Sequence, residues 1–508
     1  MTEQYLLGID VGTTGTKSVV FDTRGAAVSK GYVEYGVSLP KSDWAEQDPK
    51  VWWDAVVVSV RKAVANLPAN SHNLIGMGLS GQTNGIVAID DRGNVLHPCI
   101  VWLDRRATPQ AERVRKQLGE EQFHQITGVR IDPFYSIFKL LWFKEQKPRE
   151  FQQTAVFLQP KDYVGYRLSG QQIIDVGSAS SAGVLDVKRR KFATALLEKL
   201  DFPVEKLPKL TNPTEVIGEM TEKIANELGL PQGIPIVAGS GDVMVNAVGT
   251  GAVEPDLAYS KTATASDIVV CVDNPLLDHE SRIVTYASAI ENRWILVGGS
   301  SGGICYRWFR DNFADLELQL SRRLRKDPYE LLDYEAEMAP PGSGNLIFLP
   351  YLAGARSPIW NPNARGVFFG IGLEHGKSDF IRSIMEGIAY SMRDRIEIIE
   401  KEIGVPIGEI RAVGGGARSK LWRQIISDVC NKTIVSLACD ENECLGASIL
   451  AGAGTHAFDS VHTGITEMIH PGEKNTPDSQ LHEMYSGMFD TYRRLYDQLR
   501  QVYVEQVR

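Results

Sequence analysis

A net positive charge, paired cysteines and long apolar runs are all absent from this 508-residue sequence. The net charge of -9 argues against a nucleic-acid-binding surface, which needs clustered Lys and Arg. No apolar run reaches 18 residues, and no basic segment precedes a long apolar stretch at the N-terminus, so we expect neither a membrane span nor a signal peptide. The six cysteines form no CxxC pair, which favours reduced thiols in a cytoplasmic protein over a disulfide framework or a metal site.

Two common phosphate-binding patterns are also missing, the P-loop GxxxxGK[ST] and the dinucleotide-binding GxGxxG. What remains is the composition of a soluble globular protein, with 43% apolar and 23% charged residues. A chain of this length exceeds one ordinary hydrophobic core, so we expect two large domains. We place their boundary near Pro255, which gives domains at 1–254 and 255–508.

The two halves have similar patterns of strands and small-residue turns. In the first half, apolar segments at 5–10, 17–22, 75–79, 86–89 and 234–238 predict strands, and helical spacing predicts helices at about 50–66, 108–118 and 190–200. In the second half, strands are expected at 256–260 and 268–272, and helices after residue 303, at 378–403, at 418–430 and at about 476–506.

The turn in residues 8–17 (GIDVGTTGTK) is the first candidate site. Glycines allow backbone amides to turn toward an anion, and threonine hydroxyls add donors. Asp10 beside this turn would repel bare phosphate, so its position makes sense with a divalent cation between them. Lys17 can add positive charge. The alternative is an ordinary tight hairpin.

Asp242 follows a buried strand on the Gly-rich turn 239–241. In phosphoryl transfer a carboxylate at such a place can accept the proton of the attacking hydroxyl. The alternative is an Asp that caps the helix predicted to follow, and from local sequence alone the cap is favoured. The two roles are compatible.

Three further segments could contact ligands. Three consecutive glycines, 414–416, between a strand and a helix allow a flat ligand or a phosphate close to the backbone, or they form a structural turn. Residues 80–85 (SGQTNG) and 102–106 (WLDRR) offer amides and a carboxylate for a polyhydroxylated ligand. For Asp104 the alternative is a surface ion pair with a neighbouring Arg, and for Trp102 it is core packing.

Together, in this order, these motifs resemble the FGGY carbohydrate kinases. Two longer segments make the resemblance specific, 134–146 (FYSIFKLLWFKEQ) and the pattern from 366 to 386 that begins GVFFGI and ends SIME. Smaller similarities lie at 44–49 (WAEQDP), 161–163 (KDY) and 446–447. The resemblance covers nearly the whole chain.

The resemblance implies an actin-like ATPase fold of two duplicated ribonuclease-H-like α/β domains with a cleft between them, ATP and Mg²⁺ as cofactors, and transfer of the γ-phosphoryl group to a sugar hydroxyl. Sugar would bind mainly to the first domain and nucleotide mainly to the second. Asp242 matches the catalytic base, and with Asp10 it would also place the metal. The implied nucleotide contacts are Thr13, Thr14, Gly15, Lys17, Thr264, Gly303, Gly415 and Gly416. The implied sugar contacts are Gln82, Thr83, Asn84, Trp102, Asp104 and Asp242.

The sequence departs from the family at positions that bear on the substrate. Xylulokinases usually carry Met-His, and glycerol kinases Arg-Glu, where this chain has Thr83-Asn84. The residues that frame this pair, Ser80-Gly81-Gln82, Trp102 and Asp104, are most similar to the xylulokinase branch. We therefore expect a ketopentose such as xylulose, with gluconate, ribulose or erythritol as alternatives. Ala263 stands where the family has Gly in its second phosphate loop. A homodimer is a further possibility, because dimers are common among relatives.

Two other classes of function share parts of this pattern. An ATP-driven switch of the actin or Hsp70 kind would share the fold and the turn at Asp10, but it would not predict Asp242 or the two long segments. A non-catalytic sugar sensor would fit the altered sugar-contact positions.

Overall fold

The computed structural model describes residues 4–65, 67 and 73–505, and it divides into two compact units. The first unit contains residues 1–253, 272–295 and 441–470, and the second contains 254–271, 296–440 and 471–508. Both units therefore combine segments that are separated along the chain. The first unit contains residues on both sides of the boundary that we placed after residue 254. Within the described ranges, no helix is long and apolar enough to cross a membrane.

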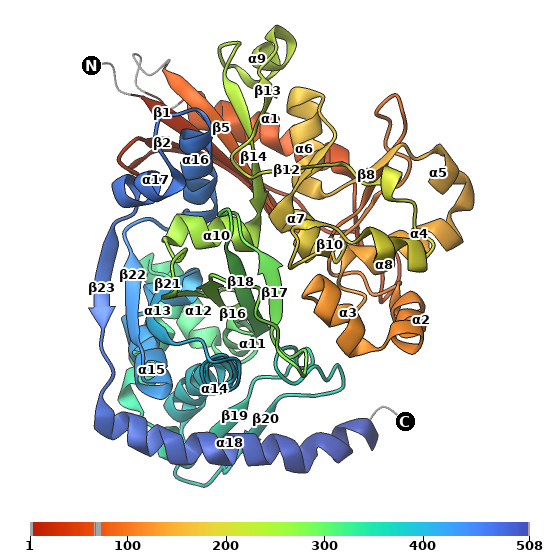
Figure 1. Ribbon diagram of the computed structural model, residues 1–508. Coiled ribbons are helices and arrows are strands. Elements are labelled where there is room, and N and C mark those ends of the chain that lie inside the picture. Colours follow the sequence, from red (N-terminus) through yellow and green to blue (C-terminus); the bar gives the residue numbers. More distant parts are fainter. Residues whose placement is uncertain (1–3, 66, 68–72, 506–508) are drawn as a thin grey trace. The chain divides into compact units, whose positions relative to one another are not determined.

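The first unit is built on a six-stranded mixed sheet (Figure 1). Its strands run in the order β13 (Val216–Glu219), β14 (Pro235–Gly241), β5 (Leu74–Gly81), β1 (Tyr5–Val11), β2 (Gly15–Asp22) and β3 (Ala27–Glu34). The strands predicted at 5–10 and 17–22 form the antiparallel hairpin β1–β2, which pairs Val11 with Thr16 at its end. Strands β5 and β14 are parallel to β1, so the carboxyl ends of all three lie at one sheet edge.

The second unit repeats this topology. Strands β23 (Pro471–Asn475), β22 (Thr433–Leu437), β21 (Ile407–Val413), β15 (Asp256–Thr262), β16 (Ala265–Val272) and β18 (Trp294–Ser301) are neighbours in this order. Strand β15 forms an antiparallel hairpin with β16 and a parallel pair with β21, as β1 does with β2 and β5. The repeated strand order supports the predicted duplication of one α/β domain.

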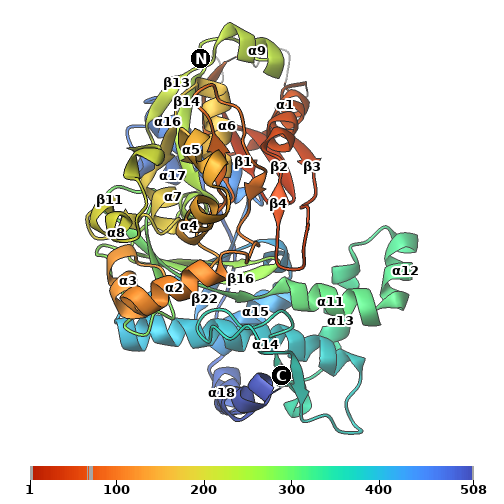
Figure 2. The same cartoon turned by 90° about the vertical axis from the view of Figure 1, so that its right-hand side faces the viewer.

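Successive side chains of β1 point to opposite faces of the first sheet, and helices cover both of these faces. Leu7 and Ile9 join one core with Trp52 and Val56 of α1 (Pro49–Ala65), the helix that lies beside β2 and β3 (Figure 2). Gly8 points to the opposite face, where a Cβ would lie 1.9 Å from the Cys444 carbonyl oxygen. Helix α16 (Asn442–Gly454) packs there directly on the strand backbone, which only glycine permits.

The remaining helices of the first unit surround its sheet and extend from it. They are α2 (Thr108–Leu118), α3 (Glu120–Thr127), α4 (Ser136–Gln146), α5 (Pro148–Gln153), α6 (Pro160–Ser169), α7 (Val176–Ser181), α8 (Thr194–Lys199), α9 (Glu222–Leu228), α10 (Asp242–Thr250) and α17 (Val461–Met468). Short strands complete it, β4 (Glu46–Gln47), β6 (Val87–Ile89), β7 (Cys99–Ile100), β8 (Val156–Leu158), β9 (Ile173–Asp175), β10 (Leu185–Asp186), β11 (Lys191–Phe192), β12 (Lys209–Thr211) and β17 (Val284–Ala287).

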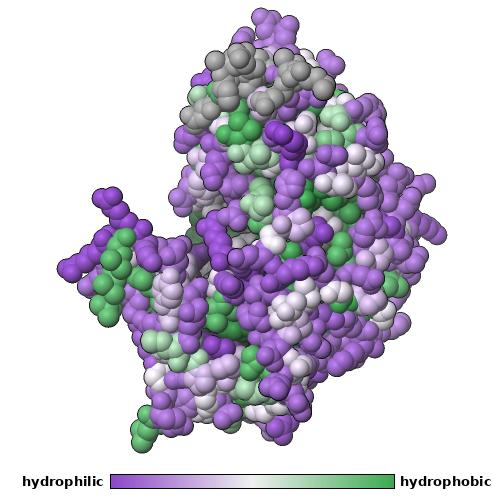
Figure 3. All heavy atoms as spheres, turned by 90° about the vertical axis from the view of Figure 1, so that its left-hand side faces the viewer, coloured by the Kyte–Doolittle hydropathy of each residue, from purple (hydrophilic) through white to green (hydrophobic). Residues whose placement is uncertain are grey.

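In the second unit, the helices are α11 (Gly303–Phe313), α12 (Asp315–Leu324), α13 (Pro328–Met338), α14 (Lys377–Glu397), α15 (Lys420–Cys430) and α18 (Ser479–Glu505), with a small hairpin of β19 (Ile347–Leu349) and β20 (Val367–Phe369). The helix predicted at 378–403 is α14 continued by a π-helical segment at Ile398–Ile403. On the face drawn in Figure 3, hydrophilic residues predominate and apolar residues form separate areas.

The helix predicted at 190–200 is wrong in its first part. Lys191 and Phe192 form β11, which pairs with β10, and helix α8 begins only at Thr194. The carboxylate of Asp186 accepts hydrogen bonds from the backbone N–H groups of Lys188 and Arg189 and so closes a turn. This local turn outweighs the helical spacing of the apolar residues.

Candidate active site

Three parallel strands end in register at one edge of the first sheet. Val11 of β1 is paired with Gly81 of β5, and Gly81 is paired with Gly241 of β14. The loops that follow these strands therefore begin side by side. Ligands of α/β proteins bind at such carboxyl strand ends. The register brings Asp10, Gln82 and Asp242 to the same edge, although they are far apart in the sequence.

The turn between β1 and β2 is closed by a backbone hydrogen bond. Gly12 N–H donates to the Gly15 carbonyl oxygen at 3.0 Å, and the Thr14 side chain is exposed. Asp10, which is half-buried, accepts a hydrogen bond of 2.8 Å from Ser80 Oγ. This arrangement suits an anion at the turn with a cation beside the carboxylate.

Lys17 is already paired within the first unit. Its Nζ lies 2.5 Å from Glu441 Oε2, and Glu441 also binds Lys30 at 3.1 Å. Burial lowers the pKa of Lys17, but the hydrogen bond and charge of Glu441 outweigh burial, so the pKa is raised. Lys17 remains protonated, and a bound phosphate would have to compete with Glu441 for it.

Hydrogen bonds join three of the predicted residues into one cluster. Trp102 Nε1 donates to Thr13 Oγ1 at 2.8 Å, and Thr13 Oγ1 donates to Gln82 Oε1 at 3.2 Å. Gln82 Nε2 in turn donates to Gln47 Oε1 at 2.9 Å. The ring of Phe134 packs edge-on against Trp102, with a centroid distance of 5.8 Å. The cluster connects the turn between β1 and β2, which was predicted to bind phosphate, to the loops that were predicted to bind sugar.

Thr83 and Asn84 lie against the turn that carries Asp242. A Cβ on Gly241 would lie 2.2 Å from the methyl carbon of Thr83, so these two loops touch closely. Asn84 is 1% exposed and adopts φ of 63°, and its Nδ2 donates to Thr83 Oγ1 at 3.3 Å. The Oδ1 atom of Asn84 is buried and has no hydrogen-bond partner among the described residues.

Asp242 is the first residue of α10 and is half-buried. Its Oδ1 accepts a hydrogen bond of 2.9 Å from Val243 N–H, and the N-cap of the helix is Gly241. The cap that local sequence favoured is thus not at Asp242. An anion at this position is stabilised by the helix dipole and stays close to the loop of Thr83.

In the second unit, the hairpin turn between β15 and β16 is one residue shorter than the turn after β1. Ala263 N–H donates to the Ala265 carbonyl oxygen at 2.8 Å, and Thr264 is exposed. A Cβ on Gly303 would lie 2.3 Å from the Ala263 carbonyl oxygen, and one on Gly416 would lie 2.6 Å from Thr262 Cγ2. Gly415 has open space where its side chain would be. Three predicted nucleotide contacts, Thr264, Gly303 and Gly416, are therefore gathered at one turn.

Comparisons with known proteins match this arrangement along nearly the whole chain. The N-terminal domain of the FGGY family of carbohydrate kinases matches residues 5–249, and its C-terminal domain matches residues 266–455. The chain belongs to the FGGY family of carbohydrate kinases. The predicted family, fold class and enzyme class are confirmed.

Individual FGGY kinases with two different substrates are similar to this chain. The gluconokinase of Bacillus subtilis (strain 168) is 31% identical over 99% of this chain and 97% of its own length. The xylulose kinase of Escherichia coli (strain K12) is 29% identical over 97% of this chain and 99% of its own length. A crystal structure of gluconate kinase from Lactobacillus acidophilus has a TM-score of 0.90 at 29% identity and covers 99% of both chains. This protein is a sugar kinase, and these comparisons leave its substrate open.

One predicted sugar contact, Asp104, has a different setting in this FGGY kinase from that expected. The Asp104 carboxylate is 0% exposed and binds the Arg106 guanidinium at 2.7 Å and Ala45 N–H at 2.6 Å. Arg106 also pairs with Glu46 and stacks over the Trp44 ring at 3.7 Å. The ion pair between Asp104 and Arg106 is thus buried, and its geometry favours a role for Asp104 in holding the loop of Trp102.

Two glutamines of the site were not assigned by sequence reasoning. Gln47 joins the hydrogen-bond cluster of Gln82, and Gln159 accepts a hydrogen bond from Asn84 N–H at 3.1 Å. Gln47 belongs to the family-like segment 44–49, which could have indicated it. Gln159 precedes the family-like segment 161–163, but no local pattern connects it to residue 84.

The structure also answers the question raised by Ala263. Ala263 is not among the described non-glycine residues with positive φ. Alanine is therefore compatible with the backbone of this loop, and the turn does not need the glycine that the family usually has.

Proposed function

We propose that this FGGY kinase transfers the γ-phosphoryl group of ATP to the primary hydroxyl of an open-chain sugar or sugar acid, with Asp242 as the general base. The substrate oxygen attacks the γ-phosphorus, the bond from phosphorus to the bridging oxygen of the β-phosphate breaks, and ADP leaves. The hydroxyl proton passes to the Asp242 carboxylate.

The observation that carries this proposal is the register of β1, β5 and β14. It brings the phosphate turn, the Thr83-Asn84 loop and Asp242 to one sheet edge within the first unit. A hydroxyl held by Asn84 and Thr83 is then close to the carboxylate. The buried Oδ1 of Asn84, which lacks a partner among the described residues, is an acceptor that a substrate hydroxyl can satisfy.

Asp10 and Asp242 are the residues that would hold Mg²⁺. Among the described residues, no group of three or more His, Cys, Asp or Glu side chains could hold a metal ion. A site of one or two carboxylates nevertheless suits Mg²⁺, which in kinases is commonly bound by few carboxylates together with water and the nucleotide phosphates. When bound, the ion would neutralise charge on the phosphoryl oxygens.

The variant Asp242→Asn tests the assignment of the base. The amide oxygen that replaces the carboxylate can still accept the Val243 N–H, so the fold should be retained. We expect kcat to fall about 10²- to 10⁴-fold with ATP binding maintained. Asp315→Asn, which changes the first residue of α12 in the second unit, is the matched control and should retain full activity. Near-normal kcat in Asp242→Asn would exclude the proposed base.

The substrate is either a ketopentose such as xylulose or the sugar acid gluconate. The framing residues Gln82, Trp102 and Asp104 favour xylulose, and the similarity to gluconokinases favours gluconate. ADP formation measured with xylulose, gluconate, ribulose, erythritol and glycerol under the same conditions would rank them by kcat/KM. ADP formation without any sugar would count against the kinase proposal.

A further inference from the structure

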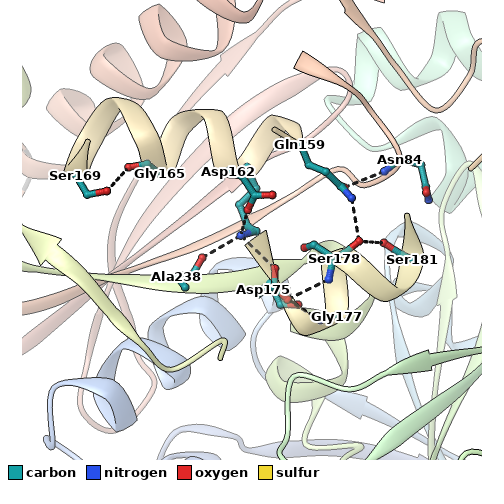
Figure 4. Close-up of polar contacts among 12 residues, drawn as sticks. Asn84, Gln159, Asp162, Gly165, Ser169, Asp175, Gly177, Ser178, Ser181 and Ala238 are labelled. Atoms are coloured by element: carbon teal, nitrogen blue, oxygen red, sulfur yellow. Dashed lines mark hydrogen bonds and ion pairs between the residues drawn. The ribbon is translucent and has the colours of Figure 1, made fainter. Parts of the chain in front are cut away.

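A buried network of charged and polar side chains lies behind the candidate active site, around helix α7 (Figure 4). Lys161 Nζ binds Asp162 Oδ1 at 2.6 Å, Asp175 Oδ2 at 3.3 Å and the Ala238 carbonyl oxygen at 3.1 Å. All three charged side chains are at most 2% exposed. Burying three charges is costly, so an arrangement of this kind needs a reason beyond stability.

Asp175 connects this network to the strand that carries Asp242. Its Oδ1 caps α7 by accepting hydrogen bonds from Gly177 N–H at 2.9 Å and Ser178 N–H at 3.1 Å. The same oxygen accepts a hydrogen bond of 2.5 Å from Ser240 Oγ. Ser240 lies two residues before Asp242, at the carboxyl end of β14. The position of this strand end is therefore fixed by the cap of α7.

Gln159 connects the other side of α7 to the sugar loop. Its Nε2 donates to the Ser178 carbonyl oxygen at 2.9 Å, and its Oε1 accepts from Asn84 N–H at 3.1 Å. Gln159 is 4% exposed, so both hydrogen bonds are shielded from water. Asn84 has a left-handed backbone, which asparagine adopts more readily than other non-glycine residues.

We propose that α7 and its partners Asp175, Ser240 and Gln159 position the active site, holding the Asp242 turn on one side and the Asn84 loop on the other. None of these residues needs to touch substrate. The proposal rests on the proposed function, because it takes Asp242 as the base and Asn84 as a sugar contact.

Close packing makes this arrangement stiff. A Cβ on Gly177 would lie 2.6 Å from Ser240 Oγ and 3.0 Å from Met244 Cγ, so α7 lies directly against β14 and α10. A displacement of about 1 Å at a reacting group can cost on the order of 10²-fold in rate. The two sides of α7 should therefore affect different steps, since Ser240 acts through the base and Gln159 acts through the sugar loop.

The first test is Ser240→Ala. This variant removes one hydroxyl and leaves Asp175 Oδ1 with two backbone donors, so the helix cap remains. We expect kcat to fall about 10- to 100-fold, with the KM for the sugar changed less than about twofold. The matched control is Ser59→Ala, because Ser59 is 0% exposed and hydrogen-bonds Ser18 Oγ at 2.8 Å in the same unit. This control should keep wild-type kcat.

The second test is Gln159→Met, which keeps the length of the side chain and removes both hydrogen bonds. We expect the KM for the sugar to rise about 10-fold, with the KM for ATP unchanged and kcat within about threefold of wild type. General destabilisation would lower the concentration of active enzyme in both variants. It could not lower mainly kcat in one variant and raise mainly the sugar KM in the other. Thermal unfolding of each variant shows whether it is folded under the assay conditions.

Equal kinetics of Ser240→Ala and Ser59→Ala would overturn the role of Ser240, and an unchanged sugar KM in Gln159→Met would overturn that of Gln159. Asp242→Asn measured beside them separates the two proposals. If that variant is inactive while Ser240→Ala and Gln159→Met behave like wild type, only the inference about α7 fails. If Asp242→Asn is active, the proposed base fails.

Discussion

The buried pair of Asp104 and Arg106 determines how the loop of Trp102 is held. Both side chains are at most 1% exposed, and Arg106 also contacts Glu46 and the Trp44 ring. Removing one partner of a buried ion pair leaves the other charge uncompensated, which costs more than the pair contributes.

Asp104→Ala should therefore act on stability before it acts on substrate binding. We expect the free energy of unfolding, measured by urea unfolding, to fall by about 3 kcal/mol. Trp102→Phe is the comparison, since it removes the hydrogen bond to Thr13 and part of a half-buried ring but leaves no buried charge unpaired. It should lower stability less than Asp104→Ala does, while raising the sugar KM. Wild-type stability with a raised sugar KM in Asp104→Ala would show instead that Asp104 contacts the sugar.

His124 should make the first unit sensitive to acid. Burial lowers the pKa of His124 to about 4, with smaller effects from Asp278 and Arg130, whereas an unfolded chain has a histidine pKa near 6.5. Between these values the unfolded state binds more protons, so stability falls as pH falls from about 6.5 to about 4. The contribution is at most roughly 3 kcal/mol.

The variant His124→Leu checks this pH dependence. It keeps a buried side chain of similar size and cannot be protonated, so its unfolding midpoint should change less than that of wild type between about pH 7 and about pH 5. His279 is exposed, so His279→Leu serves as a control for the loss of a histidine that folding does not bury. Parallel pH curves for wild type and His124→Leu would refute the assignment.

Residues that act within one short segment could be predicted from the sequence, and residues that act across segments could not. Asp10, Thr13 and Gln82 stand in Gly-rich turns after apolar strands, and the structure brings them together. Gln159 was missed because its partners are 75 and 19 positions away along the chain. Asp104 was placed in the right loop, but its burial depends on Arg106, Ala45 and Trp44 together.

At the scale of elements, glycines divide into those that the packing requires and those that it does not. Gly239 has φ of 64°, and a Cβ there would lie 1.7 Å from the Leu79 carbonyl oxygen, so it allows β14 to lie against β5. Gly415 has no atom within 4 Å of its Cβ position and is not among the glycines with positive φ. The packing of the described residues therefore leaves the space beside Gly415 available to a ligand.

Gly415→Ala separates a nucleotide contact from a structural turn. We expect the thermal unfolding midpoint to stay within about 1 °C of wild type, because the protein offers the methyl group open space. The KM for ATP should rise several-fold if the adenosine lies against this backbone, and the sugar KM should not change. Gly408→Ala, which meets only ordinary contacts at 3.5 Å or more, is the control. An unchanged KM for ATP would remove Gly415 from the nucleotide site.

The strand pattern was predicted better than the helix boundaries. Apolar segments beside Gly-rich turns predict β1, β2, β5 and β14, and the structure forms a strand at each of them. The equivalent strands of the second unit follow the same order along the chain. The helix predicted at 190–200 was wrong in part because Asp186 closes a turn through its own side chain. Such local hydrogen bonds compete with helical periodicity and leave little trace in it.

At the scale of the whole molecule, the two units cannot be separated by a cut at one position along the chain. The first unit receives α16 and α17 from residues 441–470, far beyond residue 254. Helix α16 packs on β1 and β5 so closely that Cβ atoms on Gly8 and Gly78 would lie within 2.0 Å of its carbonyl oxygens. Without that helix, the buried face of both strands would be exposed to water.

A fragment of residues 1–254 should therefore fail to fold cooperatively, although it contains every predicted sugar-contact residue. We expect a broad, weakly cooperative urea transition and strong binding of an apolar dye, because the face that α16 covers has no partner. Fusing residues 441–470 to the fragment through a flexible linker should restore a sharp transition. Replacing Gly446 with Val in that fusion should abolish the rescue, since a Cβ there would already lie 2.2 Å from the Val245 carbonyl oxygen. A sharp transition in the unfused fragment would show that the N-terminal segment forms its core alone, and α16 would then add only to a fold that is already complete.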